Sequence, residues 1–158
     1  MKARAHSPAG FSLIELTLAL GVAAFCLITV FGLMAVALIT QQASVRQTTA
    51  TAIISQIAAD LGAATRLPPG QQSKQFSLTG HWAAAASPDQ LYFMTDGTFI
   101  TGSTNQSTVP TNAVFGATVT YLKPPTETTS LADITVTWPA QAAVPTGSVE
   151  TFAAINRQ

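Results

Sequence analysis

An apolar stretch near the amino terminus constrains the fold of this chain more than any other feature. Residues 11–39 contain a single charged side chain, Glu15. A run of this length is long enough to cross a bilayer as an α-helix, which needs about 20 apolar residues. A carboxylate at the centre of such a helix costs roughly 2.5–3.5 kcal/mol, and less near an end. Glu15 therefore needs a partner, and we interpret it first as a functional residue.

The composition of the remaining chain limits what the protein can do. The 119 residues after Ile39 are enough for one domain with a modest core. Only 9% of all residues are charged, and the formal net charge is zero. Because no basic patch exists, nucleic acid is not expected as a partner. The single cysteine, Cys26, cannot form an intramolecular disulfide, so packing must hold the fold.

The residues before the apolar stretch carry two positive charges, Lys2 and Arg4. Positive residues at this position keep the amino terminus in the cytoplasm and place the rest of the chain outside. A cleaved secretory signal is one interpretation, favoured by the small-x-small sequence at 35–37. However, the apolar run is too long for a signal core, and it contains Glu15. A plain signal anchor fits the length but leaves Glu15 unexplained.

A third interpretation rests on the residues at the start of the apolar stretch, which read GFSLIEL at positions 10–16. They resemble the processing motif of type IV prepilins and pseudopilins. In that family a prepilin peptidase cuts after the glycine and methylates the new amino-terminal phenylalanine. The resemblance implies cleavage between Gly10 and Phe11 and methylation of Phe11. Glu15 then becomes the fifth residue of the mature chain, where the family has its glutamate.

Cleavage would give Glu15 a partner, because it creates a positive amino group at Phe11. That amine is as unfavourable in an apolar medium as the carboxylate. In an assembly, Glu15 of one subunit can meet the Phe11 amine of a neighbour. Removing either group would leave a buried unpaired charge, at a cost of roughly 3–5 kcal/mol. We expect this pair to set the register between subunits. The alternative is that Glu15 extends to the nearby membrane interface.

The apolar helix also has predicted points of flexibility. Many pilins have prolines in this helix, whereas here no proline occurs between Pro8 and Pro68. Glycine inside a helix costs about 1 kcal/mol relative to alanine. We therefore predict that Gly21 and Gly32 are the weak points, and that local melting or bending during assembly centres on Gly32.

The helix is predicted to continue beyond the apolar stretch. Apolar side chains recur at helical spacing along one stripe, while polar residues such as Arg46 and Asp60 fall largely on the other side. Prolines after Leu67 end the pattern. One helix over about residues 11–65 is expected, with 11–40 apolar all round and 41–66 amphipathic. The stripe consists of Val45, Thr49, Ile53, Ile57 and Leu61, with Ala50, Ile54 and Ala58 beside them.

The last part of the chain, residues 67–158, has the alternation and turn residues of strands. Asp96 and Gly97 lie between two apolar runs and predict a hairpin. Because no helix intervenes between the strands, we expect an antiparallel sheet of about four strands, and so an α+β fold. The expected runs are 75–79, 91–95, 98–101, 114–122 (ended by Pro124 and Pro125), a strand with Ile134, Val136 and Trp138 on one face, and 149–155.

The sequence does not indicate catalysis. His81 is accompanied by no nucleophile elbow, paired carboxylates or metal-ligand spacing, so neither an enzyme nor a cofactor is expected. Asp89, Asp96 and Asp133 are candidate calcium ligands, by resemblance to a loop in some pseudopilins. A tight calcium site needs a dense acidic loop, which this chain lacks. We interpret the three as turn residues and predict no metal site.

These features predict a structural subunit of a type IV pilus-like or pseudopilus filament. Residues 1–10 are the expected leader, removed by prepilin peptidase. The precursor is expected in the inner membrane, with its carboxyl-terminal part in the periplasm. Its later partners are copies of itself or related pilins in a filament outside the cytoplasm or on the cell surface. The alternative is a monomeric, single-span extracytoplasmic binding module whose Thr-rich loops recognise a ligand.

Overall fold

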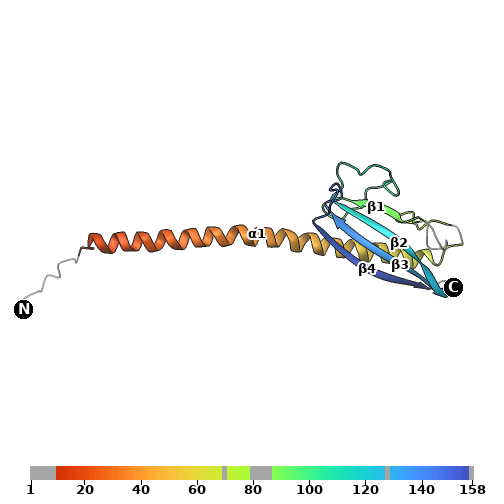
Figure 1. Cartoon of the computed structure of the whole chain (residues 1–158), viewed down its shortest axis with the longest axis horizontal. Coiled ribbons are helices and arrows are strands. Elements are labelled where there is room, and N and C mark those ends of the chain that lie inside the picture. Colours follow the sequence, from red (N-terminus) through yellow and green to blue (C-terminus); the bar gives the residue numbers. More distant parts are fainter. Residues whose placement is uncertain (1–9, 69–70, 79–86, 127–128, 157–158) are drawn as a thin grey trace, which may run out of the picture. The chain divides into compact units, whose positions relative to one another are not determined.

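The structure is a computed structural model, and it describes residues 10–68, 71–78, 87–126 and 129–156. Within these ranges the elements are α1 (Leu13–Ala64), β1 (Asp89–Phe93), β2 (Phe115–Thr126), β3 (Thr129–Trp138) and β4 (Gly147–Asn156) (Figure 1). The chain divides into two units, residues 1–43 and 44–158. The α+β class predicted from the sequence, with one long amino-terminal helix and a four-stranded antiparallel sheet, is confirmed.

The four strands form a meander in the order β1-β2-β3-β4, with every neighbouring pair antiparallel. Alternate residues point to opposite faces of a sheet. One face is buried against the second half of α1, and it includes the predicted row of Ile134, Val136 and Trp138. The register places these residues beside apolar residues of the neighbouring strands. The pairs include Phe93 with Phe115, Val119 with Ile134, and Val136 with Val149.

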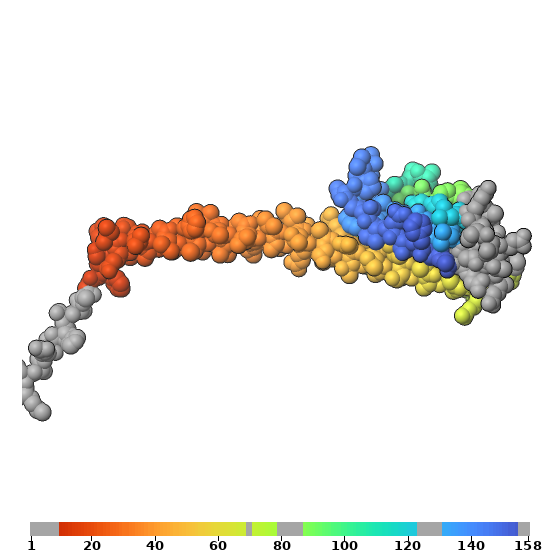
Figure 2. Space-filling model, turned by 60° about the horizontal axis from the view of Figure 1, so that its bottom comes forward, coloured from red at the N-terminus to blue at the C-terminus, as the bar shows by residue number. Residues whose placement is uncertain are grey.

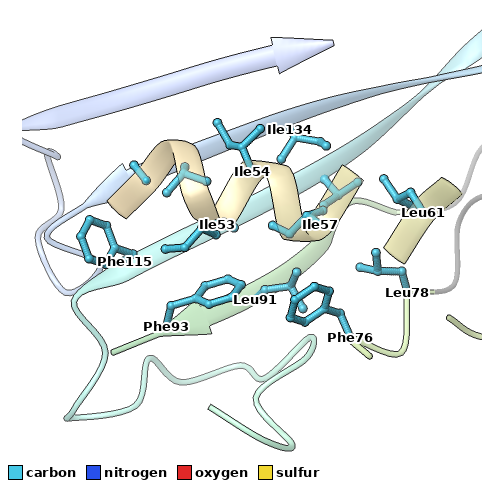
Figure 3. Packing of buried hydrophobic residues seen from close by; sticks show 14 of the residues in the cluster. Ile53, Ile54, Ile57, Leu61, Phe76, Leu78, Leu91, Phe93, Phe115 and Ile134 are labelled. Atoms are coloured by element: carbon cyan, nitrogen blue, oxygen red, sulfur yellow. The ribbon is translucent and has the colours of Figure 1, made fainter. Parts of the chain in front are cut away.

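The part of α1 after residue 44 supplies the other side of this core (Figure 3). Its stripe is buried from Ala50 onward, whereas Val45 remains 57% exposed. Phe76, Phe93 and Phe99 add an aromatic cluster beside the stripe, with ring centroids 5.0–5.7 Å apart. The buried residues of α1 are Ala50, Ile53, Ile54, Ile57, Asp60, Leu61 and Ala64.

Two predicted strand segments differ from the structure. Residues 75–78 form no strand. Their backbone N–H groups donate hydrogen bonds to the side chains of Asp60 and Ser73, so they are not available to a neighbouring strand. Residue 79 lies outside the described residues. The Asp96–Gly97 turn is present, but after it the chain makes only one isolated bridge, Phe93 to Phe99.

Further backbone hydrogen bonds run from the segment after the turn to β1 and to Met94, which follows β1. They join Met94 to Thr98, Ile100 to Tyr92, and Asn105 to Gln90. This segment therefore covers the free edge of β1.

The end of β2 also differs from the prediction. Pro124 and Pro125 were expected to end the strand, but β2 continues to Thr126. A register shift between Leu122 and Thr126 accommodates the two prolines, since a bulge removes the need for their missing N–H groups.

Candidate assembly site

The first unit presents a mainly apolar surface. In the described part of residues 1–43 every residue is exposed (Figure 2). By length and composition α1 contains a segment able to cross a membrane. The threonine hydroxyls within this segment are satisfied by the helix itself. The hydroxyls of Thr17, Thr29 and Thr40 each donate to the carbonyl oxygen three or four residues earlier. This surface is therefore suited to an apolar surrounding.

Glu15 has a partner within its own chain, immediately before α1. Its Oε2 accepts a hydrogen bond of 2.9 Å from the backbone N–H of Ser12, and the Ser12 carbonyl accepts the N–H of Leu16 at 3.2 Å. A Ser followed three residues later by Glu is the spacing of a capping box, in which the glutamate returns to the N–H before the helix. This spacing was visible in the sequence, and our sequence interpretation missed it. The bond uses one carboxylate oxygen.

The two predicted processing residues lie immediately before this cap. Gly10 and Phe11 both precede α1, and the Phe11 side chain is 93% exposed. The bond from the Ser12 N–H places the Glu15 carboxylate beside the residue that follows Phe11. Cleavage and methylation at these residues stay predictions.

The predicted weak points, Gly21 and Gly32, are both helical in the structure. A Cβ atom added at either would have no neighbour within 4 Å. No packing contact therefore requires glycine at either position, and their role in bending during assembly stays a prediction.

Asp60 was placed on the polar side of the helix, and this is wrong. Its side chain is only 6% exposed, and its two oxygens accept the N–H groups of Gln75 at 3.2 Å and Phe76 at 3.1 Å. The segment after α1 folds back over this part of the helix. Beside it lies a cavity of about 240 Å³, lined by Asp60, Ala63, Ala64, Arg66, Leu67 and Lys74.

The three candidate calcium ligands serve different local structures. Asp89 is buried at the start of β1, where it accepts hydrogen bonds from Asn105 and from the Tyr121 hydroxyl at 2.7 and 2.8 Å. Asp96 caps its turn by accepting the N–H of Thr98. Asp133 lies within β3. The described residues contain no group of three or more His, Cys, Asp or Glu side chains placed to hold a metal. His81 lies outside them.

The turn also lowers the pKa of Asp96. The hydrogen bond from the Thr98 backbone lowers the pKa of this carboxyl below its usual 3.8. A lowered folded-state pKa means that the carboxylate contributes stability above pH 3.8. That contribution is lost as the pH falls through the folded-state pKa.

Comparison with known proteins adds no family to these observations. No protein-family model, curated protein or solved structure matches the chain. The architecture, a long amino-terminal apolar helix followed by an antiparallel sheet, is compatible with that of pilins.

Proposed function

We propose that the chain is a structural subunit of a type IV pilus-like or pseudopilus filament. The observation that carries the proposal is an exposed apolar helix with one carboxylate, Glu15, at its start. Before assembly, the inner membrane covers this surface. After cleavage between Gly10 and Phe11, the corresponding helices of neighbouring subunits cover it in the filament core, and the sheets form the outside.

The hydrogen bonding of Glu15 is compatible with this role. Its bond to Ser12 engages Oε2, and within the described residues Oε1 has no hydrogen-bond partner. The capping bond holds the carboxylate at the helix start. Oε1 remains available to the Phe11 amine of a neighbouring subunit. A charge-assisted bond of this kind is roughly twice as strong as one between neutral groups.

Substitutions at Glu15 separate pairing from capping. Glutamine retains the capping acceptor, since a capping box accepts either Glu or Gln, but it removes the charge. If pairing is the essential role, Glu15→Gln leaves the neighbour's amine unpaired, at a cost of roughly 3–5 kcal/mol. This corresponds to a loss of at least roughly 100-fold in the association constant. Glu15→Ala should be equally defective. Filament yield after shearing from cells measures the effect.

Ser12→Ala is the matched control. It retains the backbone N–H that donates to Glu15, and should assemble like the unmodified chain. Normal assembly of Glu15→Gln with loss in Glu15→Ala would reassign Glu15 to capping alone. Normal assembly of both variants would contradict the pairing role. Absence of filaments from the unmodified chain would favour the monomeric binding module.

A further inference from the structure

The outer face of the sheet, turned away from α1, carries an exposed aromatic residue near two acids. Phe152 of β4 is 59% exposed and pairs directly with Asp133 of β3. Glu150 lies two residues before Phe152, so it shares the same face. Residues directly opposite on neighbouring strands have Cβ atoms about 4.5–5.5 Å apart. Phe152 therefore has one acid across from it on β3 and a second acid two residues before it on β4.

The two acids differ in how far they are exposed on this face. Glu150 is exposed, whereas Asp133 is half-buried. The Oδ1 atom of Asp133 is inaccessible to solvent and has no hydrogen-bond partner among the described residues. A contact with another chain can therefore use only the remainder of the Asp133 side chain.

A complementary feature lies at the carboxyl-terminal end of α1. The cavity of about 240 Å³ there has apolar walls from Ala63, Ala64 and Leu67. Arg66 and Lys74 also line it; both are exposed, and within the described residues neither makes an ion pair. Asp60 is part of the wall, but two backbone N–H groups already bind its carboxylate. This cavity can take one aromatic side chain and leaves two cations at its rim.

We propose that Phe152 of one copy of the chain inserts into this cavity of a second copy. Asp133 and Glu150 of the first copy then face Arg66 and Lys74 of the second. The contact places two cations opposite two carboxylates and buries the exposed ring of Phe152. The inference rests on the proposed function, because it describes how the globular units of neighbouring filament subunits meet.

The positions of the two surfaces determine the kind of assembly. Phe152 lies on the outer face of the sheet, whereas the cavity lies beside the end of α1, and both belong to the unit formed by residues 44–158. Each copy then uses its aromatic residue on one neighbour and its cavity on another. A heterologous contact of this kind that does not close into a ring generates an open helical filament.

Cysteine cross-linking tests this contact in the full chain. With Cys26→Ser as background, Ala63→Cys combined with Ala154→Cys places one thiol at the cavity and one on the outer face, two residues from Phe152, which keeps its ring. Both positions are exposed, so the fold should tolerate them. Oxidation of cells carrying this variant should give a ladder of covalent multimers. Cells that co-express the two single-cysteine chains should give dimers only, because each chain then has one thiol.

The matched control pairs Ala63→Cys with Val144→Cys, which is 80% exposed in the segment before β4. It should give no ladder. Absence of a ladder from the 63/154 pair, an equal ladder from the 63/144 pair, or a single dimer band from the 63/154 pair would each overturn the proposal.

Charge exchange tests the ionic part independently. Adding Asp133→Lys and Glu150→Lys to the 63/154 variant should abolish the ladder. Adding Arg66→Glu and Lys74→Glu as well should restore it. A ladder that survives the first change, or is not restored by the second, would contradict the assigned ion pairs.

The same cells distinguish failure of this contact from failure of the proposed function. A chain that is processed at Phe11 and needs Glu15 for filaments, but gives no ladder, overturns the contact alone. An unprocessed chain overturns the proposed function, whatever the cross-linking result.

Discussion

Asp60 connects α1 to the segment that follows it. One carboxylate satisfies the N–H groups of Gln75 and Phe76, and Phe76 is completely buried. Helical periodicity placed Asp60 on the solvent side, because the pattern identifies a polar side chain but not the segment that will fold over it. The error therefore marks a tertiary contact that sequence spacing does not encode.

Removal of this carboxylate should destabilise the fold. Asp60→Ala leaves two N–H groups without their acceptor, and an unsatisfied buried donor costs about 1–3 kcal/mol. Asp60→Asn keeps one acceptor oxygen and should lose less. The free energy of unfolding in urea measures both. Gln56→Ala, at an exposed position of the same helix, is the control and should change stability by less than about 0.5 kcal/mol. Equal losses in Asp60→Ala and the control would contradict this role.

Glu15 shows how far residue-level reasoning extends. The sequence alone indicated that an acid in an apolar stretch needs a partner, and the resemblance named one on another subunit. Within the chain, the structure gives it a second partner, the N–H of Ser12. The spacing of Ser12 and Glu15 was sufficient to predict this bond, because capping depends only on local sequence.

At the scale of elements, local patterns predicted α1 and most of the sheet. The strands β2, β3 and β4 were predicted from alternating apolar residues, and this alternation arises because one face of the sheet is buried. The second strand predicted for the hairpin is not a full strand. Residues 98–101 have the sequence pattern of a strand but make only one bridge, to Phe93. Whether such a segment forms a full strand depends on where it lies along the edge of the sheet, and local sequence does not specify that position.

The connection between β3 and β4 gives an element-scale prediction. Gly147 begins β4 opposite Trp138, and a Cβ atom at this position would collide with the indole ring. Trp138 is buried against Phe115 and has little room to move. Gly147→Ala should therefore destabilise the fold by about 1–3 kcal/mol, as overpacking does.

Gly62→Ala is the matched control for Gly147→Ala. Gly62 lies in α1 with nothing within 4 Å of an added Cβ, so alanine should stabilise the helix by roughly 0.5–1 kcal/mol. Urea unfolding of both variants provides the comparison. Destabilisation by both, or by neither, would contradict the close contact with Trp138.

At the scale of the whole molecule, the sequence predicts two environments, because the helix changes from apolar all round to amphipathic. The structure accounts for the second environment, since the stripe from Ala50 onward is buried by the chain's own sheet. The first environment must come from outside the chain. The outer-face position of Phe152 and the cavity beside Arg66 could not be predicted, because both depend on strand register and on the fold-back over Asp60.

The central claim is that the apolar helix is processed and then packed in a filament. Intact-mass and amino-terminal analysis of the protein in filaments sheared from cells tests it most directly. The account predicts a chain that begins at methylated Phe11. A chain that retains Met1, or one that begins at Leu38 after signal cleavage, would contradict it.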